Sequence, residues 1–252
     1  MGEAVYVYGV MPAARVGSLD VRGVKGGEVR LVEQDGLAAL VSPMRGDELA
    51  AASEVRAHWR VLDELVREVT VLPVRFGTVM DGDDAVREGL LGANSERLRA
   101  LVAELDGKVQ LTVKGDYHEQ PLLREAVRAS PEVARLRERI RGLPEAAGYY
   151  DRIRLGELVA AEVAKRRERD TRRALELLEP HAVEAREETP SGPDAAFNLA
   201  FLVERGAQER FTEAVRALAT ELSERTDIRY IGPLPPYSFA DVELSTGSAA
   251  WA

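Results

Sequence analysis

Residue types that carry out chemistry in proteins are sparse in this sequence of 252 residues. It contains no cysteine, which excludes disulfides, thiol nucleophiles and cysteine-ligated zinc. The three histidines, His58, His118 and His181, are far apart and form no pair at the spacing of one helical turn. A metal site built from several histidines is therefore not expected, and the sequence predicts neither a metal nor a cofactor.

Glycine-rich and acidic stretches do not complete a catalytic pattern either. The glycines within Gly23–Gly27 lack the spacing and the following helix of a phosphate-binding loop, and no Gly-x-Ser-x-Gly nucleophile elbow occurs. The aspartates within Asp81–Asp84 are typical of the first turn of a helix, where carboxylates complement the helix dipole, and magnesium binding is the alternative. We therefore expect no catalytic residues and no small-molecule substrate, with an enzyme of unrecognised type as an alternative.

Charge argues against a nucleic-acid partner. The chain has 34 basic and 43 acidic residues and a formal net charge of −9, whereas proteins that bind duplex DNA usually present a basic footprint. The most basic stretch is Lys165–Arg173, and aromatic residues that could stack on bases make up only 6% of the chain. We interpret this stretch as the solvated middle of a long helix, with a nucleic-acid-binding module as the alternative.

The first third of the chain predicts a small sheet with a helix. Alternating or β-branched runs predict strands at 5–10, 29–33 and 37–41, and Asp35-Gly36 predicts a hairpin between the last two. From Asp47 to Val69 the apolar residues recur at spacings of three and four, which predicts a helix with one apolar stripe that includes Val55 and Trp59. His58 lies inside this helix as a structural or surface residue, and contact with a partner is the alternative.

The run Val71–Val79 is apolar on both faces and too short for a helix, so it predicts a buried strand. Arg75 lies within it, and an unpaired buried guanidinium is costly, so this side chain must form an ion pair or reach solvent. A structural ion pair is one interpretation, and binding of a partner by Arg75 is the other. Two short helices, Asp83–Leu91 and Ser95–Leu105, complete a predicted N-terminal domain of mixed α/β structure at residues 1–105.

The rest of the chain predicts a second domain at residues 106–234. Its expected elements follow the order strand, helices, strand, strand, helix, strand, which is the ferredoxin-like βαββαβ arrangement with an elongated helical insertion. The predicted strands are 109–114, 182–188, 196–204 and 228–231, and the predicted helices are 119–129, 131–141, 149–179 and 208–222. The fold class is thus α+β with two domains.

Aromatic residues near the end of the chain are candidates for contact with a partner protein. Prolines extend the segment Gly232–Val242 and place Tyr237 and Phe239 on one side. The segment either docks back onto the fold or is presented to a partner, and a C-terminal tail at 235–252 is expected to dock. Phe197 and Phe201, on one face of a predicted strand, are further candidates for partner binding.

Several stretches together resemble the gas vesicle GvpL/GvpF family. They are Tyr6-Val7-Tyr8-Gly9-Val10, Val71-Leu72-Pro73-Val74-Arg75-Phe76-Gly77-Thr78, Phe197-Asn198-Leu199-Ala200-Phe201-Leu202-Val203 and Gly232-Pro233-Leu234-Pro235-Pro236-Tyr237-Ser238-Phe239. Their order and spacing span nearly the whole chain. The resemblance covers both the L-like and the F-like members of the family.

The resemblance implies a non-enzymatic role in gas vesicle assembly. It implies an accessory or minor structural protein that binds the small hydrophobic shell protein and other accessory proteins, and that limits aggregation of the shell protein during nucleation. The family has no catalytic residues to carry over. The sequence has no run of about 18 apolar residues and its start has no signal-peptide pattern, so we expect no membrane partner and a location in the cytoplasm and gas vesicle.

Overall fold

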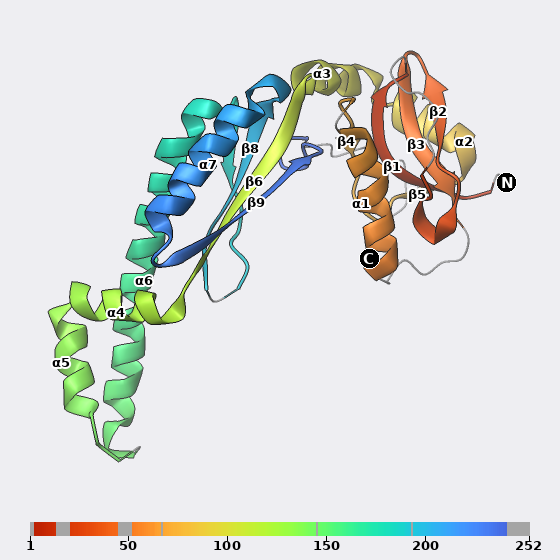
Figure 1. Ribbon diagram of the computed structural model, residues 1–252. Coiled ribbons are helices and arrows are strands. Elements are labelled where there is room, and N and C mark those ends of the chain that lie inside the picture. Colours follow the sequence, from red (N-terminus) through yellow and green to blue (C-terminus); the bar gives the residue numbers. More distant parts are fainter. Residues whose placement is uncertain are drawn as a thin grey trace. The chain divides into compact units, whose positions relative to one another are not determined.

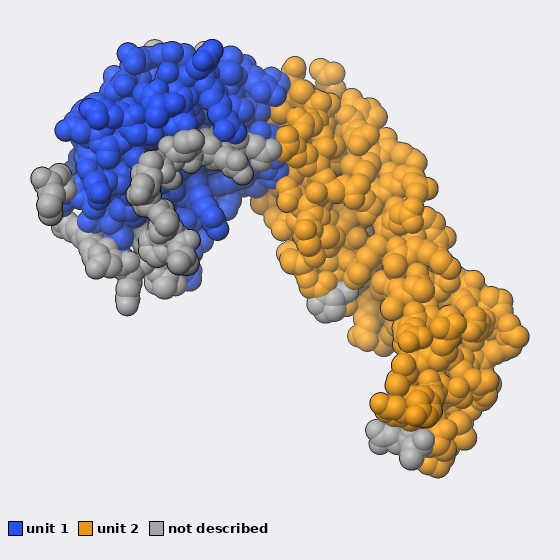
Figure 2. All heavy atoms as spheres, turned by 180° about the vertical axis from the view of Figure 1, so that it is seen from behind, with its two compact units in different colours: residues 1–111, 232–252 blue, residues 112–231 orange. Residues whose placement is uncertain are grey.

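The first strand of the chain, β1 (Val5–Pro12), is buried along most of its length and lies in the middle of an antiparallel sheet. In this computed structural model, residues 3–13, 21–44, 52–66, 68–144, 146–192 and 194–240 are described. Contacts divide the chain into two compact units, residues 1–111 with 232–252, and residues 112–231 (Figure 2). The fold is mixed α/β with two antiparallel sheets, and each unit is described by itself.

In the first unit, β1 lies between β3 (Leu37–Pro43) and the short strands β4 (Leu72–Pro73) and β5 (Val79–Met80). The strand β2 (Arg30–Gln34) pairs with β3, giving the order β2-β3-β1-β4. Asp35 and Gly36 connect β2 to β3 with φ angles of 51° and 80°, the left-handed backbone that tight hairpins need. The predicted hairpin is therefore confirmed.

Glycine allows β1 to pack closely on its neighbours. A Cβ atom at Gly9 would lie 2.7 Å from the Leu72 carbonyl oxygen and 2.8 Å from Val71 Cγ1, both below van der Waals contact. The β1–β3 register shifts between Val7 and Gly9, at a bulge beside this contact. The Tyr-Val-Tyr-Gly stretch thus combines two inward tyrosines with a close backbone approach.

Helical segments complete the first unit (Figure 1). They are η2 (Val24–Gly26), α1 (Ala52–Val66), α2 (Gly82–Ala85), the π-helical η3 (Val86–Gly92) and α3 (Ser95–Leu105). The predicted helix start at Asp47 lies outside the described residues. The predicted stripe of α1 is corrected at its first half, because Val55 is 39% and Trp59 is 40% exposed while Leu62, Leu65 and Val66 are buried.

The predicted buried strand at 71–79 is wrong in its middle. Only Leu72–Pro73 and Val79–Met80 are strands, and a turn lies between them. The backbone N–H and the hydroxyl of Thr78 both donate to the Arg75 carbonyl, and Gly77 has a φ of 91°, so the chain reverses there. Arg75 is exposed in this turn, and no ion pair joins it to any carboxylate among the described residues.

The second sheet has the strand order β7-β8-β6-β9. Its strands are β6 (Lys108–Tyr117), β7 (Glu184–Glu187), β8 (Ala195–Glu204) and β9 (Thr226–Leu234). The helices of this part are α4 (Glu119–Ala129), α5 (Pro131–Ile140), η4 (Ala146–Gly148), α6 (Tyr149–Leu178), η5 (Glu179–His181), η6 (Arg205–Ala207) and α7 (Gln208–Leu222). The predicted order of strands and helices is observed.

Helices α6 and α7 pack on the second sheet, while α5 runs beside the first half of α6 as a helical hairpin (Figure 1). Phe201 on β8 is fully buried, and its ring lies 5.1 Å from that of Phe211 on α7. Ser130 caps α5 by accepting from the Val133 N–H at 3.3 Å. No helix of the described chain is both long and apolar enough to cross a bilayer.

Candidate functional site

Five side chains from four separate stretches meet in the first unit and form what we call the tyrosine–histidine cluster. They are Tyr6, Tyr8, His58, Phe76 and Tyr237. Tyr6 and Tyr8 lie two residues apart on β1 and therefore point to the same face of the sheet. His58 comes from α1, Phe76 from the turn between β4 and β5, and Tyr237 from the segment after β9.

A chain of hydrogen bonds runs through the cluster. The Gly77 N–H donates to the Tyr6 hydroxyl at 3.1 Å, so we assign the Tyr6 O–H as the donor to His58 Nδ1 at 3.0 Å. A neutral imidazole that accepts at Nδ1 carries its proton on Nε2, and Nε2 lies 3.1 Å from the Tyr237 hydroxyl. This tautomer satisfies both ring nitrogens in a residue that is only 1% exposed.

Tyr8 anchors the opposite side of the cluster. Its ring stacks on His58 at 5.6 Å between centroids, and its hydroxyl accepts from the Val24 N–H at 2.7 Å. The same hydroxyl forms a hydrogen bond with Ser42 Oγ at 2.8 Å. A Cβ atom at Gly23 would overlap the Tyr8 hydroxyl, so this loop can approach the ring only because residue 23 is glycine.

Burial holds every ionisable group of the cluster in its neutral form near pH 7. Desolvation lowers the pKa of His58 to about 4 and raises the pKa of Tyr6 to about 12. Desolvation also raises the pKa values of Tyr8 and Tyr237. The cluster therefore contains neither a cationic histidine nor a tyrosinate. Its side chains pack and hydrogen-bond to one another, so its role is structural.

An exposed apolar pair borders the cluster on α1. Val55 and Trp59 are one helical turn apart and so lie on one face of the helix. The Trp59 ring lies 4.7 Å from that of Tyr237, which is in turn bonded to His58. We call Val55 and Trp59 the Trp59 surface, since Trp59 is the larger of its two side chains.

The second unit contains a buried ionic network around Asp170, a residue only 3% exposed. Asp170 Oδ2 accepts from the Tyr117 hydroxyl at 2.9 Å, and Oδ1 accepts from Arg225 Nη2 at 3.0 Å. Arg166 Nε lies 3.8 Å from the same carboxylate and also pairs with Glu125. Burial and the nearby Asp170 charge raise the pKa of Tyr117.

The basic stretch Lys165–Arg173 is therefore solvated only in part. Lys165 pairs with Glu162, Arg172 with Glu168, and Arg173 with Glu221. Sequence analysis missed the burial of Asp170, although a signal was present. Asp170 lies four and eight residues before the buried Ala174 and Leu178, on the face of α6 that packs inward.

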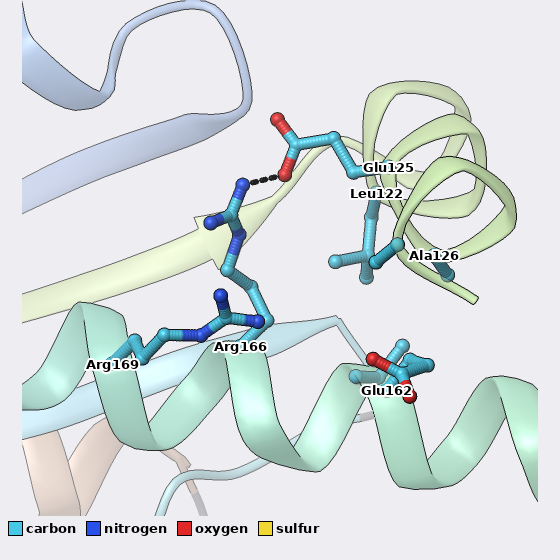
Figure 3. A pocket seen from close by; sticks show the side chains of 8 residues that line it. Leu122, Glu125, Ala126, Glu162, Arg166 and Arg169 are labelled. Atoms are coloured by element: carbon cyan, nitrogen blue, oxygen red, sulfur yellow. Dashed lines mark hydrogen bonds and ion pairs between the residues drawn. The ribbon is translucent and has the colours of Figure 1, made fainter.

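A small hollow between α4 and α6 adjoins this network (Figure 3). It has a volume of about 70 Å³ and is lined by Leu122, Glu125, Ala126, Ala129, Glu162, Val163, Arg166 and Arg169. Figure 3 shows the Arg166 guanidinium turned toward Glu125, so its charge is paired within the protein.

A second hollow, lined in part by Leu37, Arg99 and Val102, lies in the first unit. No group of three or more histidine, aspartate or glutamate side chains could hold a metal ion among the described residues.

The residues predicted to bind a partner are dispersed. Arg75 is exposed, Tyr237 is half-buried in the tyrosine–histidine cluster, and Phe239 is 5% exposed. Phe197 and Phe201 lie inside the second unit with exposed fractions of 1% and 0%. Among these residues, Tyr237 and Arg75 are linked through His58. The His58 ring bonds to the Tyr237 hydroxyl and packs against Phe76, which follows Arg75 in the turn.

The C-terminal segment docks on the first unit as far as it is described. The Ser238 N–H donates to Gln110 Oε1 at 2.8 Å, and Tyr237 packs against the core. Three of the four stretches that carry the resemblance, from β1, from the β4–β5 turn and from this segment, therefore meet in one cluster. Sequence reasoning missed Trp59 as a surface residue, because its spacing fits an apolar stripe equally well.

Comparisons with known proteins identify the family. Residues 4–241 match the family described as gas vesicle synthesis protein GvpL/GvpF. The chain is 34% identical over 241 residues to gas vesicle protein F of Streptomyces sp. (strain CB03234), covering 94% of this chain and 100% of that protein. It is also 29% identical to gas vesicle protein L of the same strain, covering 94% and 92% of the two chains.

Two solved structures share the fold of this chain over nearly its whole length. The crystal structure of gas vesicle protein GvpF from Anabaena sp. PCC7120 matches with a TM-score of 0.82 and 25% identity, over 96% of this chain and 100% of that chain. The GvpF structure from Microcystis aeruginosa matches with a TM-score of 0.79 and 26% identity, over 95% and 100%. A fold shared over whole chains, together with the family match, leaves one assignment: this chain belongs to the gas vesicle GvpL/GvpF family.

Proposed function

We propose that this protein is a non-enzymatic assembly factor of the gas vesicle, which binds the small hydrophobic shell protein and limits its aggregation during nucleation. Membership of the GvpL/GvpF family supports a gas vesicle accessory or structural role. Other gas vesicle accessory proteins are proposed as further partners, and the cytoplasm as the place where assembly begins. The strand order β7-β8-β6-β9 supports our classification of the second sheet as ferredoxin-like.

The observation that carries the proposal is the Trp59 surface. Tryptophan is the residue type most enriched at binding hot spots, and Trp59 is 40% exposed beside an equally exposed Val55. The tyrosine–histidine cluster holds Trp59 in place, because the Trp59 ring packs against Tyr237, which is hydrogen-bonded to His58. A preformed apolar surface on a chain with 31% charged residues can hold an apolar client while the complex stays in solution.

The test measures the binding and the aggregation of the shell protein directly. Shell protein diluted out of urea is followed by light scattering with and without the full chain, and affinity is measured by fluorescence anisotropy of labelled shell protein. Trp59→Ala should weaken the affinity by about thirtyfold, which corresponds to about 2 kcal/mol for a hot-spot aromatic. It should also shorten the delay of aggregation.

Tyr150→Ala is the matched control, because Tyr150 is an aromatic residue of the second unit with an exposed fraction of 83%. Its loss should leave affinity and delay unchanged. Thermal unfolding of each variant separates lost binding from lost folding. Equal affinities for wild type and Trp59→Ala would contradict the role of the Trp59 surface, and a wild type without effect on aggregation would contradict the function itself.

A further inference from the structure

One strand edge of the second sheet differs from every other edge in the described chain. The order β7-β8-β6-β9 leaves β7 and β9 at the ends of this sheet, and β9 is nine residues long (Figure 1). A free edge exposes a row of unpaired backbone N–H and C=O groups that can accept another strand. Proteins normally protect such edges by shortness, by charged side chains or by a covering helix or loop.

The other edges are protected. Strand β7 has only four residues, and Glu184 and Glu187 are exposed on it. In the first sheet, β4 and β5 have two residues each, while Arg30 of β2 pairs with Asp83 of α2 at 2.6 Å. Shortness or a neighbouring helix therefore accounts for each of them.

Strand β9 is longer than these edges, and its stretch Thr226–Ile231 presents exposed apolar side chains beside its charged ones. Tyr230 is 36% and Ile231 is 39% exposed, and as neighbours in a strand they point to opposite faces of the sheet. The Tyr230 hydroxyl lies 3.2 Å from Thr212 Oγ1, and its ring lies 6.2 Å from that of Phe211, so its position is fixed. An added strand would thus meet an apolar side chain on each face.

Both charged side chains of this stretch are exposed, Asp227 to 77% and Arg229 to 59%, and each lies beside a residue on or next to β6. Arg229 Nη2 lies 2.6 Å from Asp116 Oδ2 on β6, the strand on the paired side of β9. His118 Nε2, just after β6, lies 3.0 Å from Asp227 Oδ2. Arg229 is therefore paired within the sheet, whereas Asp227 faces solvent beside a histidine that is charged only when protonated, so the edge keeps a negative charge near its start.

We infer that the Thr226–Ile231 edge accepts an apolar, extended segment of the shell protein by β-strand addition. Six residues at about 3.3 Å each give an edge of about 20 Å, so the segment added is about six residues long. The inference rests on the proposed function, since it names a surface for the same client. It adds a backbone-mediated contact in the second unit to the side-chain contact at the Trp59 surface.

The experiment combines hydrogen exchange with charge variants of the full chain. Urea-diluted shell protein is the probe, and exchange of the amides at 226–231 is followed by mass spectrometry. Wild type should show slowed exchange at 226–231 when the shell protein is present. Ile231→Lys places a cation on the edge, and Asp116→Asn releases the charge of Arg229, so each should weaken binding by about tenfold.

Each edge variant has a control on the protected edge β7. Val183→Lys places a lysine at a residue that is 54% exposed just before β7, and Glu184→Gln releases Arg186 from its ion pair. Both controls should bind the shell protein as wild type does. Circular dichroism melts of all four variants identify any that fail to fold, and the exchange measurement on wild type needs no substitution.

The outcomes separate the edge from the function. Slowed exchange at 226–231 with loss of binding in both edge variants supports the inference. If wild type delays aggregation while exchange at 226–231 is unchanged, the edge is overturned and the proposed function stands. If wild type neither binds the shell protein nor delays its aggregation, both are overturned.

Discussion

The pKa of His58 makes a quantitative prediction about stability. The folded protein holds this pKa at about 4, against 6.5 for a histidine in an unfolded chain, because burial disfavours the imidazolium. The unfolded state therefore binds more protons than the folded state at pH values between these two. The free energy of unfolding that depends on His58 is fully present above pH 6.5 and falls as the pH drops toward 4. Below pH 4 the loss is complete and does not grow further.

The magnitude follows from the size of the pKa difference. A difference of one corresponds to 1.36 kcal/mol, so the change from 6.5 to about 4 corresponds to about 3 kcal/mol in total. About 2 kcal/mol of this is lost between pH 7 and pH 4.5. The hydrogen-bond chain gives the structural reason, since a proton on Nδ1 would displace the donated Tyr6 O–H while Nε2–H already faces Tyr237.

His58→Gln is the informative perturbation, because an amide does not titrate but can still donate and accept. Urea unfolding is followed by fluorescence in a Trp251→Phe background, so that Trp59 is the one tryptophan that contributes to the signal. Aspartate and glutamate titration affects both proteins equally, and the difference between their free energies of unfolding isolates His58. That difference should shrink by about 2 kcal/mol from pH 7 to pH 4.5. Parallel pH profiles for the two proteins would show that burial does not depress the pKa of His58.

Two further substitutions test the packing of each unit. Gly23→Ala places a methyl group on the Tyr8 hydroxyl and should lower the free energy of unfolding by about 1–3 kcal/mol, whereas Gly26→Ala on the same loop meets no atom and reports only backbone strain. Asp170→Ala leaves Arg225 and Tyr117 without their acceptor and should cost about 3 kcal/mol in urea unfolding followed by circular dichroism. A smaller loss in Asp170→Asn is expected, and equal melts for wild type and Asp170→Ala would contradict the role of the network.

Local signals in the sequence predicted local structure well. Asp35-Gly36 predicted the hairpin because the turn itself demands positive φ angles, and both residues have them. The helix predicted at 131–141 is observed as α5, which begins at Pro131 because the Ser130 cap and a first-turn proline act within a few residues. The long helix predicted at 149–179 is observed as α6 at Tyr149–Leu178.

The candidate site depended on distant partners and could be predicted only in part. A helical stripe shows which side of α1 is apolar, but neighbouring elements decide that Leu62 is covered and Trp59 is not. Apolar composition favoured a single strand at 71–79, while the positive φ of Gly77 turned the chain and exposed Arg75. Pairing of His58 with Tyr237 joins residues 179 positions apart, which no local pattern encodes.

The Tyr237–His58 contact can form only after most of the chain has been synthesised. A ribosome adds about 5–20 residues each second, so the 179 positions between the two residues take about 9–36 s to synthesise. Throughout that interval one ring nitrogen of His58 has only water to bind, and the first unit lacks its last segment. The second unit is translated whole in the same interval, so we expect the part of the protein that is made later to finish folding first.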